Sequence, residues 1–203
     1  MKDWTELASD RKIQQTIDAL KTNGINALVV ENQKLAKEKV FELLPLGAEV
    51  MTMSSVTLQT TGIAKEIDES GKYDSVRNKL KKMDRKTQSL EMRKLGAAPA
   101  WAVGSVNAVT EDGIVMTASN TGSQLGPYVY GSEHVIWVVG TQKIVKDIDE
   151  AVERIYEYCL PLESERLKKI FGSPSNASKK LTISEEIRPN RITLIFVKEK
   201  LGF

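Results

Sequence analysis

In the first quarter of the chain, the hydrophobic pattern alternates between helical and strand spacing. Ile13, Ile17 and Leu20 recur at helical spacing, whereas the apolar run after Asn23-Gly24 is short, continuous and β-branched at its end. The pattern predicts, in chain order, a helix over residues 2–23, a strand over 26–31, a helix over 33–44 and a strand over 48–53. This alternation favours a parallel sheet with right-handed crossovers.

The rest of the chain continues the same alternation. The strongest strand is predicted over 135–139, which is entirely apolar and mostly β-branched. Pro161 is expected to break the chain between two late helices. The other predicted elements are a helix from Ser54 or Ser55 to residue 67, a helix ending at 96–99, strands at 114–117, 181–184 and 192–197, helices at 149–160 and 163–171, and a flexible connector at 172–178.

Composition limits the size and the partners of the protein. With 203 residues the chain is long enough for one well-buried core, so we expect one α/β domain over residues 1–203, with the first helix packed on it. The net charge is only +2, so we expect neither nucleic acid nor a membrane as a partner. The basic stretch 77–86 has no interleaved aromatic residues, which favours a solvated helix face over a nucleic-acid groove.

The cysteine content and the lack of targeting signals favour a reducing compartment. Cys159 is the only cysteine, so the chain alone forms no internal disulfide and holds no cysteine-ligated iron–sulfur cluster. No apolar run is long enough to span a bilayer, and the first residues lack the apolar core of a signal peptide. We therefore expect a cytoplasmic protein. The single histidine makes a usual zinc site improbable, whereas an oxygen-ligated magnesium site stays open.

A hydroxyl-rich turn directly follows the strand predicted at 48–53. It contains Thr52, Ser54, Ser55 and Thr57. One interpretation is that Ser54 or Ser55 caps the next helix. The other is that the turn binds an anion, because the first N–H groups of a helix are free to donate. Both interpretations are kept, since one turn can serve both purposes.

Two further polar loops lie next to strands predicted in the middle of the chain. Residues 104–107 and 119–126 are rich in glycine and small polar side chains, which let a ligand approach the backbone. Neither loop matches a P-loop or the dinucleotide fingerprint, so the expected ligand is a phosphate, a carboxylate or a pantetheine-like chain. A plain solvated loop at 119–126 is the alternative. The candidate ligand-binding residues here are Gly104, Ser105, Asn107, Asn120, Thr121, Gly122 and Ser123.

Glu111 is the candidate for acid–base or nucleophilic chemistry. It stands in the turn 110–113, where Asp112-Gly113 is also a strong hairpin signal. In the hairpin interpretation, which we prefer, Asp112 bonds to the backbone and the turn is structural. In the functional interpretation, Glu111 is a general base or nucleophile beside the glycine loop. His134, Cys159 and the three tryptophans are expected to be structural.

Several blocks of the sequence resemble a known family. The run 104–113 is similar to a Gly-Ser-Asn-Ala-(Ile/Leu)-Thr-Glu-Asp-Gly pattern, and 135–151 resembles a block that combines Val-Val-Gly with Lys-Ile-Val. Residues 190–203 resemble the usual C-terminal end of the same family, and Ser55-Val-Thr-Leu58 with Gly62 is similar to its early Ser-x-Thr-Leu turn. These blocks resemble the LUD-domain proteins, the lactate-utilisation (DUF162-type) family.

The resemblance implies a fold and a set of partners. The fold is that of sugar-phosphate isomerases and coenzyme A transferases, a three-layer α/β arrangement with a parallel-rich sheet and helices on both faces. Some family members act beside iron–sulfur oxidoreductase subunits that oxidise L-lactate to pyruvate, so such subunits are implied as partners. Members of one branch carry cysteines in the region that matches residues 171–187, but this chain has none there, so we expect no iron–sulfur cluster in it.

The sequence supports three hypotheses about function. The first is a lactate-utilisation-type protein that binds a small anionic metabolite or an acyl-carrier ligand where the polar turns meet. The second is an active isomerase, cyclo-ligase or coenzyme A transferase, which requires Glu111 to lie in the pocket beside the glycine loop. The third is a non-catalytic assembly subunit, which predicts an apolar surface patch and no deep pocket. Self-association is expected as well.

Overall fold

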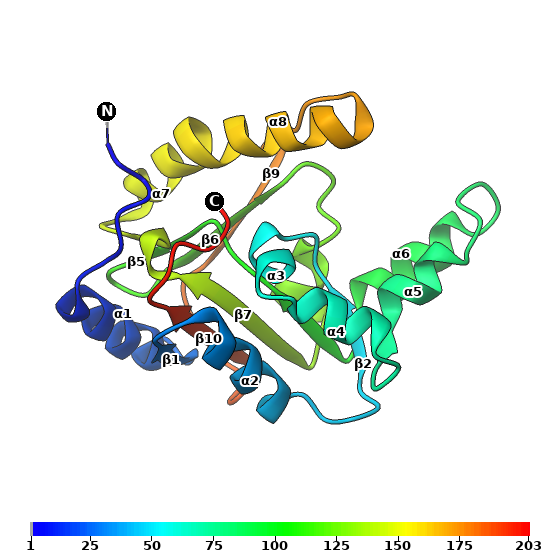
Figure 1. The fold of residues 1–203 in the computed structure, drawn as a ribbon, viewed down its shortest axis with the longest axis horizontal. Helices are drawn as coiled ribbons and strands as arrows, with labels where there is room; N and C mark the ends of the chain where they lie inside the picture. Colours follow the sequence, from blue (N-terminus) through cyan, green and yellow to red (C-terminus); the bar gives the residue numbers. More distant parts are fainter. Residues whose placement is uncertain (1) are drawn as a thin grey trace.

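A six-stranded parallel sheet forms the centre of the protein in a computed structural model, which describes residues 2–203 (Figure 1). In spatial order its strands are β1 (Asn26–Val30), β10 (Ile192–Val197), β7 (His134–Gly140), β4 (Trp101–Gly104), β2 (Glu49–Thr52) and β3 (Asp74–Ser75). The apolar runs predicted at 135–139 and 192–197 become the neighbours β7 and β10, which are covered on both faces. The predicted α/β fold with a parallel-rich sheet is therefore confirmed.

Three helices cover one face of this sheet. They are α2 (Gln33–Leu43), α3 (Val56–Thr60) and α4 (Ile63–Glu69). Val40, Leu58 and Ile63 belong to the apolar cluster that also contains residues of β7 and β10. The single helix predicted to residue 67 is interrupted, because Gly62 adopts a left-handed φ of 69° and starts a new helix.

The other face is covered by α1 (Asp10–Thr22) and by a second sheet. The prediction that the first helix begins at residue 2 is wrong, since the side chain of Ser9 caps the helix by accepting a hydrogen bond from the Lys12 backbone N–H. The strands of the second sheet, in spatial order, are β8 (Ile144–Val145), β5 (Ala108–Thr110), β6 (Val115–Ser119) and β9 (Lys179–Ile183).

A hairpin lies at the centre of the second sheet. Strands β5 and β6 are antiparallel and are joined by residues 111–114, which confirms the hairpin interpretation of this turn. The strands β3, β4, β5 and β8 were not predicted individually, and each has only two to four residues. Runs this short carry too little periodicity to be recognised.

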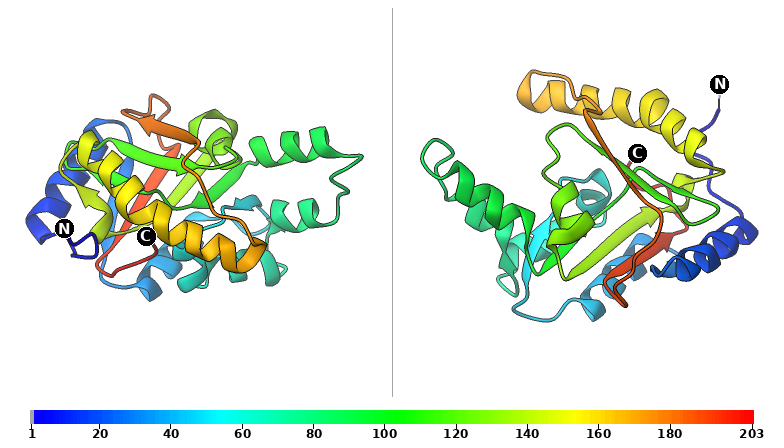
Figure 2. Two further views of the ribbon diagram at one scale, coloured as in Figure 1. Left: turned by 90° about the horizontal axis from the view of Figure 1, so that it is seen from above. Right: turned by 180° about the vertical axis from the view of Figure 1, so that it is seen from behind.

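An outer helical layer crosses the second sheet (Figures 1 and 2). It consists of α7 (Ile148–Arg154), the π-helical turn η3 (Ile155–Cys159) and α8 (Leu160–Phe171). The prediction that Pro161 breaks the chain is wrong. In η3 the N–H of Leu160 bonds to the carbonyl of Ile155, so the helix is already shifting its hydrogen-bond register where proline lacks its donor.

The helices α5 (Val76–Lys81) and α6 (Ser89–Ala97) project from the body of the protein as an arm in all three views (Figures 1 and 2). Helix α6 has no buried residue and contacts the π-helical turn η1 (Pro127–Gly131). A short 3-10 turn, η2 (Thr141–Lys143), follows β7. None of the helices within residues 2–203 is both long and apolar enough to cross a membrane.

Candidate functional site

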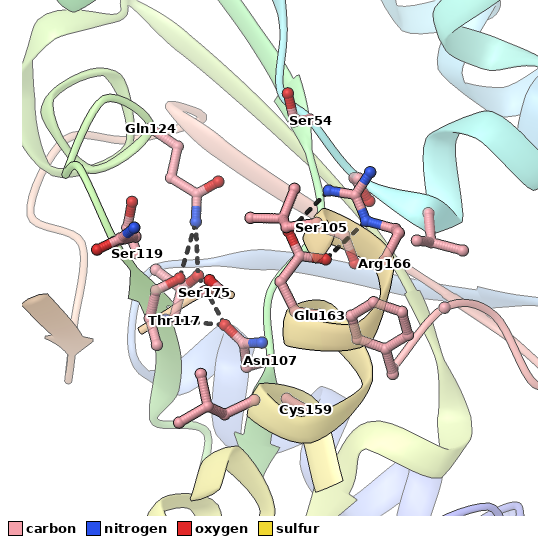
Figure 3. Close-up of a pocket in the computed structure, with 18 of the residues that line it drawn as sticks. Ser54, Ser105, Asn107, Thr117, Ser119, Gln124, Cys159, Glu163, Arg166 and Ser175 are labelled. Carbon is pink, nitrogen blue, oxygen red and sulfur yellow. Dashed lines mark hydrogen bonds and ion pairs between the residues drawn. The ribbon is translucent and has the colours of Figure 1, made fainter. Parts of the chain in front are cut away.

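A pocket of about 490 Å³ lies between the carboxyl ends of the central strands and helix α8 (Figure 3). Ser54 follows β2, Ser105 follows β4, Lys143 follows β7 and Gly202 follows β10, and all four line the pocket. Parallel strands place their carboxyl ends at one edge of a sheet, where open α/β folds usually bind ligands. The pocket is therefore in the position that this architecture favours for a binding site.

The structure brings most of the predicted binding residues together. The hydroxyl-rich turn after β2 and the polar loop after β6 line the same pocket, although more than sixty residues separate them in the sequence. The hairpin end that contains Asn107 lies between them. The predicted residues that line the pocket are Ser54, Ser55, Thr57, Ser105, Asn107, Asn120, Thr121 and Ser123.

Three predicted binding residues do not line this pocket. The hydroxyl of buried Thr52 bonds to the Asp68 carboxylate at 3.0 Å and accepts a hydrogen bond from Arg77 Nε at 3.0 Å. Gly104 packs against Tyr128, whose hydroxyl would lie 1.8 Å from an added Cβ. Gly122 turns the polar loop with a φ of 86°. These residues support the site from behind, so the prediction that they contact a ligand is not carried further.

The turn after β2 caps its helix and also borders the pocket. Ser55 Oγ accepts a hydrogen bond from the Leu58 backbone N–H at 3.4 Å, which confirms the cap. Ser54 Oγ accepts one from Arg77 Nη2 at 3.2 Å. Helix α3 has only five residues, so its dipole adds little attraction for an anion. Any contribution of this turn to binding therefore comes from its hydroxyl groups.

Glu111 lies outside the pocket, at the opposite end of the β5–β6 hairpin. Its carboxylate forms an ion pair with Lys12 of α1 at 2.8 Å, and its backbone N–H donates to the Val145 carbonyl. The neighbouring Asp112 accepts a hydrogen bond from the Thr110 hydroxyl. The prediction that Glu111 stands beside the glycine loop is therefore wrong, because the turn instead fastens the hairpin to helix α1.

Lys143 is the main residue that the sequence did not single out. It is 2% exposed, and its Nζ donates to Ser105 Oγ at 3.1 Å, to the Val106 carbonyl at 3.1 Å and to Thr57 Oγ1 at 3.4 Å. Burial, followed by the positive charge of Arg154, lowers the pKa of Lys143 to about 7. The available signal was its position just after the most apolar strand, where a lysine is placed at the carboxyl edge of the sheet.

Arg154 is a second buried cation behind the wall of the pocket. Its Nη1 donates to the Asn107 carbonyl at 2.6 Å and lies 2.9 Å from Cys159 Sγ. Its Nε and Nη2 have no hydrogen-bond partner within residues 2–203, and burial lowers its pKa. Cys159 is buried as predicted and also lines the pocket. The positive charge of Arg154 is thus available to act on the groups in front of it.

A polar network fixes the hairpin side of the pocket. Asn107 Oδ1 accepts hydrogen bonds from Thr117 Oγ1 at 3.2 Å and from the Ala118 backbone N–H at 2.8 Å. Gln124 Nε2 donates to the Ala118 carbonyl at 3.0 Å and to Thr117 Oγ1 at 3.5 Å (Figure 3). Because Asn107 uses its oxygen in this network, its amide NH₂ group is left to donate toward a ligand.

Helix α8 supplies a wall with one ion pair and several apolar side chains. Glu163 and Arg166 pair through two contacts of 2.7 Å (Figure 3). Leu167, Ile170 and Phe171 continue the wall, and Phe171 is 74% exposed. The pocket therefore has a polar floor and a partly apolar side.

The remaining residues noted in the sequence have structural contacts. The ring of His134 stacks on Trp101 with centroids 4.2 Å apart. Trp137 is fully buried and meets Tyr128 edge-on. Across the described part of the chain, 2–203, no three histidine, cysteine or acidic side chains gather closely enough to hold a metal ion.

Comparison with known proteins identifies the family. A family model described as the LUD domain matches residues 13–197. The chain belongs to the LUD domain family. A search of curated proteins finds no match to this LUD domain. It is similar to the crystal structure of a DUF162 family protein from Deinococcus radiodurans, with 13% identity, a TM-score of 0.56 and coverage of 95% of this chain and 99% of that one. At this identity, the likeness concerns the fold alone.

Proposed function

We propose that this LUD domain binds a small anionic metabolite, or the polar end of an acyl-carrier ligand, in the pocket at the carboxyl edge of its main sheet. Family membership connects this binding with a role in lactate utilisation. The observation that carries the proposal is the position of Lys143, whose Nζ lies at the pocket floor beside the hydroxyls of Ser105 and Thr57. A cation and several hydroxyl and amide donors around one cavity are the groups that bind carboxylates and phosphates.

The electrostatics of the pocket support an anionic ligand. The three hydrogen bonds of Lys143 go to two hydroxyls and a carbonyl, so none of them neutralises its charge. Arg154 adds a second positive charge behind the Asn107 carbonyl. The acidic wall residue Glu163 is already paired with Arg166. An anion that enters the pocket would therefore reach uncompensated positive charge, which raises the free energy gained on binding.

The apolar side of the pocket supports the acyl-carrier form of the proposal. Ile170 and Phe171 of α8 are 56% and 74% exposed although both line the pocket. A ligand with an anionic head at Lys143 and an acyl or pantetheine chain along α8 would cover these side chains. The volume of about 490 Å³ lies within the range of ligand sites and is larger than a single carboxylate needs.

The other two hypotheses fit the geometry less well. Isomerase, cyclo-ligase or transferase chemistry based on Glu111 loses its catalytic group, because Glu111 pairs with Lys12 outside the pocket. A pure assembly subunit was expected to have no deep pocket, whereas this chain has one at the edge of its sheet. Association with iron–sulfur oxidoreductase subunits and self-association remain part of our proposal as roles beside ligand binding.

A thermal-shift screen, followed by calorimetry, tests the proposal. The full chain is screened with sugar phosphates, lactate, coenzyme A thioesters and folates. We expect at least one class to raise the melting temperature, and Lys143→Met and Asn120→Ala to weaken that response. Removal of a buried charge contact typically costs about 1.5–3 kcal/mol, which corresponds to a loss of affinity of roughly tenfold or more.

The matched control is Lys146→Met. This is the same chemical change at a lysine whose side chain is 78% exposed and does not line the pocket. It should leave the response unchanged. A screen in which no ligand class raises the melting temperature, or in which the response survives Lys143→Met, would overturn the proposal.

A further inference from the structure

We propose that Lys143 is a carbonyl-reactive amine that forms an imine with a small oxo acid bound in the pocket. The inference rests on the proposed function, because the pocket must first accept the anionic end of the substrate. It assigns a chemical role to a residue that anion binding alone would use only as a charge.

The geometry holds the amine in one place. Lys143 is the last residue of η2, directly after the central strand β7, and Ser105 Oγ, Thr57 Oγ1 and the Val106 carbonyl all lie within 3.4 Å of its Nζ. A flexible surface lysine has no such fixed position. A carbonyl carbon that enters the pocket would therefore meet a positioned nitrogen.

The surroundings favour the neutral amine, which is the nucleophilic form. The charged or titratable groups that face Lys143 are Arg154 from α7 and Cys159 from η3. Burial and the like charge of Arg154 together bring its pKa to about 7, so roughly half of the amine is neutral at that pH. Desolvation and a neighbouring cation are the two means by which proteins activate a lysine for imine formation.

The stability cost of Lys143 also favours a chemical role. A buried ammonium that is not paired with a carboxylate lowers the stability of the fold, and an apolar side chain of similar length would avoid this cost. Its three hydrogen-bond acceptors reduce the cost without neutralising the charge. Perturbed titratable groups inside pockets are concentrated at functional sites.

The reaction balances without an oxidant or a reductant. The nitrogen lone pair of neutral Lys143 attacks the carbonyl carbon, a C–N bond forms, and the carbonyl π electrons move to oxygen. One amine proton passes to that oxygen, and Ser105 Oγ, which accepts a hydrogen bond from Nζ at 3.1 Å, is placed to relay it. The carbinolamine then loses its hydroxyl with the second amine proton as water, which leaves a C=N bond to Lys143.

Reductive trapping of the full chain tests this step. The protein is incubated with pyruvate and sodium cyanoborohydride near neutral pH, digested and mapped by mass spectrometry. Lactate serves as the matched anion without a carbonyl group, and acetone as the matched ketone without a charge. We expect the peptide that contains Lys143 to gain the mass of pyruvate less one oxygen atom. It should be labelled at least about tenfold faster than the peptide of exposed Lys146, because most of that amine is protonated near pH 7.

The pH dependence and the unmodified site decide the result. The trapping rate at Lys143 should rise with pH through a midpoint near 7 and then level off. Labels confined to exposed lysines, with none on Lys143, would overturn the inference. If pyruvate and lactate stabilise the protein equally and no adduct forms at Lys143, the imine chemistry fails while anion binding stands. If acetone labels Lys143 as fast as pyruvate does, the imine chemistry is supported while anion binding fails.

Arg154 is a positioning residue in this scheme, and its charge can be tested separately. Arg154→Met removes the like charge and should move the midpoint of the trapping rate at Lys143 to higher pH. Arg154→Lys retains the charge and should hold the midpoint closer to that of the unchanged protein. A purely structural role for Arg154 would change stability in both variants without moving the midpoint.

Discussion

The two ends of the β5–β6 hairpin have opposite fates in this protein. At one end, the acidic turn with Glu111 and Asp112 packs against α1, where Asn23 Nδ2 donates to the Asp112 and Gly113 carbonyls at 3.1 and 3.2 Å. At the other end, Asn107 and Ser119 border the open pocket. The end with conventional catalytic side chains is used for packing, and the end with small polar side chains faces the cavity.

The difference shows that residue type alone does not identify a site. Glu111 has a nearby cation in Lys12, which satisfies its charge outside the pocket. Lys143, beyond the open end of the hairpin, is buried and bonded to three uncharged oxygens. A charge that the fold leaves without a counter-charge can act on a ligand, whereas a paired charge mainly contributes to packing.

The largest expected effect breaks the packed end. Gly113→Ala should lower the free energy of unfolding by about 3 kcal/mol, because a left-handed residue and an overpacked contact each cost about 1–3 kcal/mol. Gly113 has a φ of 83°, and an added Cβ would lie 2.8 Å from backbone atoms of α1. Urea denaturation measures the change.

Gly122→Ala at the open end is the matched control. Its φ is 86°, but the added Cβ would meet only the flexible side chain of Lys179. We expect a loss of about 1 kcal/mol, which is the backbone contribution alone. Equal losses in the two variants would contradict the view that one end is packed and the other is open.

The next effect concerns the open end and has the opposite sign. Lys143→Met should raise the free energy of unfolding by about 2 kcal/mol near pH 6, because it removes a buried charge. The pKa of Lys143 is about 7 in the folded protein against an ordinary 10.5, so the unfolded chain binds more protons between these values. The unchanged protein should therefore become more stable as the pH rises from 7 toward 10.5, and the variant should lack this gain.

Urea denaturation across this pH range measures the second effect. Lys146→Met is the control, and its pH dependence should match that of the unchanged protein. If Lys143→Met has the same slope of stability against pH as the unchanged protein, the buried lysine does not titrate as we infer.

A smaller effect sharpens the role of the pocket floor. Ser105→Ala removes a hydroxyl that accepts from Lys143 at 3.1 Å and borders the cavity. We expect affinity for the anion found by screening to fall about fivefold, since one hydrogen bond contributes about 1 kcal/mol. Calorimetry measures the loss. Ser164→Ala, whose hydroxyl bonds to Ser175 outside the cavity floor, should leave the affinity unchanged.

The smallest effect is expected at Glu111. Glu111→Gln should change the free energy of unfolding by no more than about 0.5 kcal/mol, because Lys12 is half exposed and such pairs contribute little. Ligand affinity should stay the same. A loss of affinity of tenfold or more on this substitution would return Glu111 to the list of functional residues.

The sequence predicted the long elements better than the short ones. The strands β1, β7 and β10 and the helix α2 match their predicted ranges closely, because each has a run of apolar residues at a clear spacing. Strand β4 lies between β7 and β2 but contains only Trp101-Ala-Val-Gly104. A strand this short depends on its neighbours for hydrogen bonds, so its own residues do not reveal it.

The same reasoning applies to the site. The hydroxyls and amides of Ser54, Ser105 and Asn120 could be proposed from the sequence, because polar loops at the ends of parallel strands tend to meet. Lys143 could not be separated from the other lysines, since only its burial distinguishes it. Glu111 was over-weighted because its partner, Lys12, is almost one hundred residues away in the sequence.

The sequence by itself determined the family, the parallel sheet and the polar loops at its carboxyl edge, because periodicity and local turn residues act over short distances. Only the tertiary structure decided which charges are compensated. Burial and ion pairing depend on groups brought together from distant parts of the chain, as Lys143 and Ser105 are at the pocket and Glu111 and Lys12 are at helix α1.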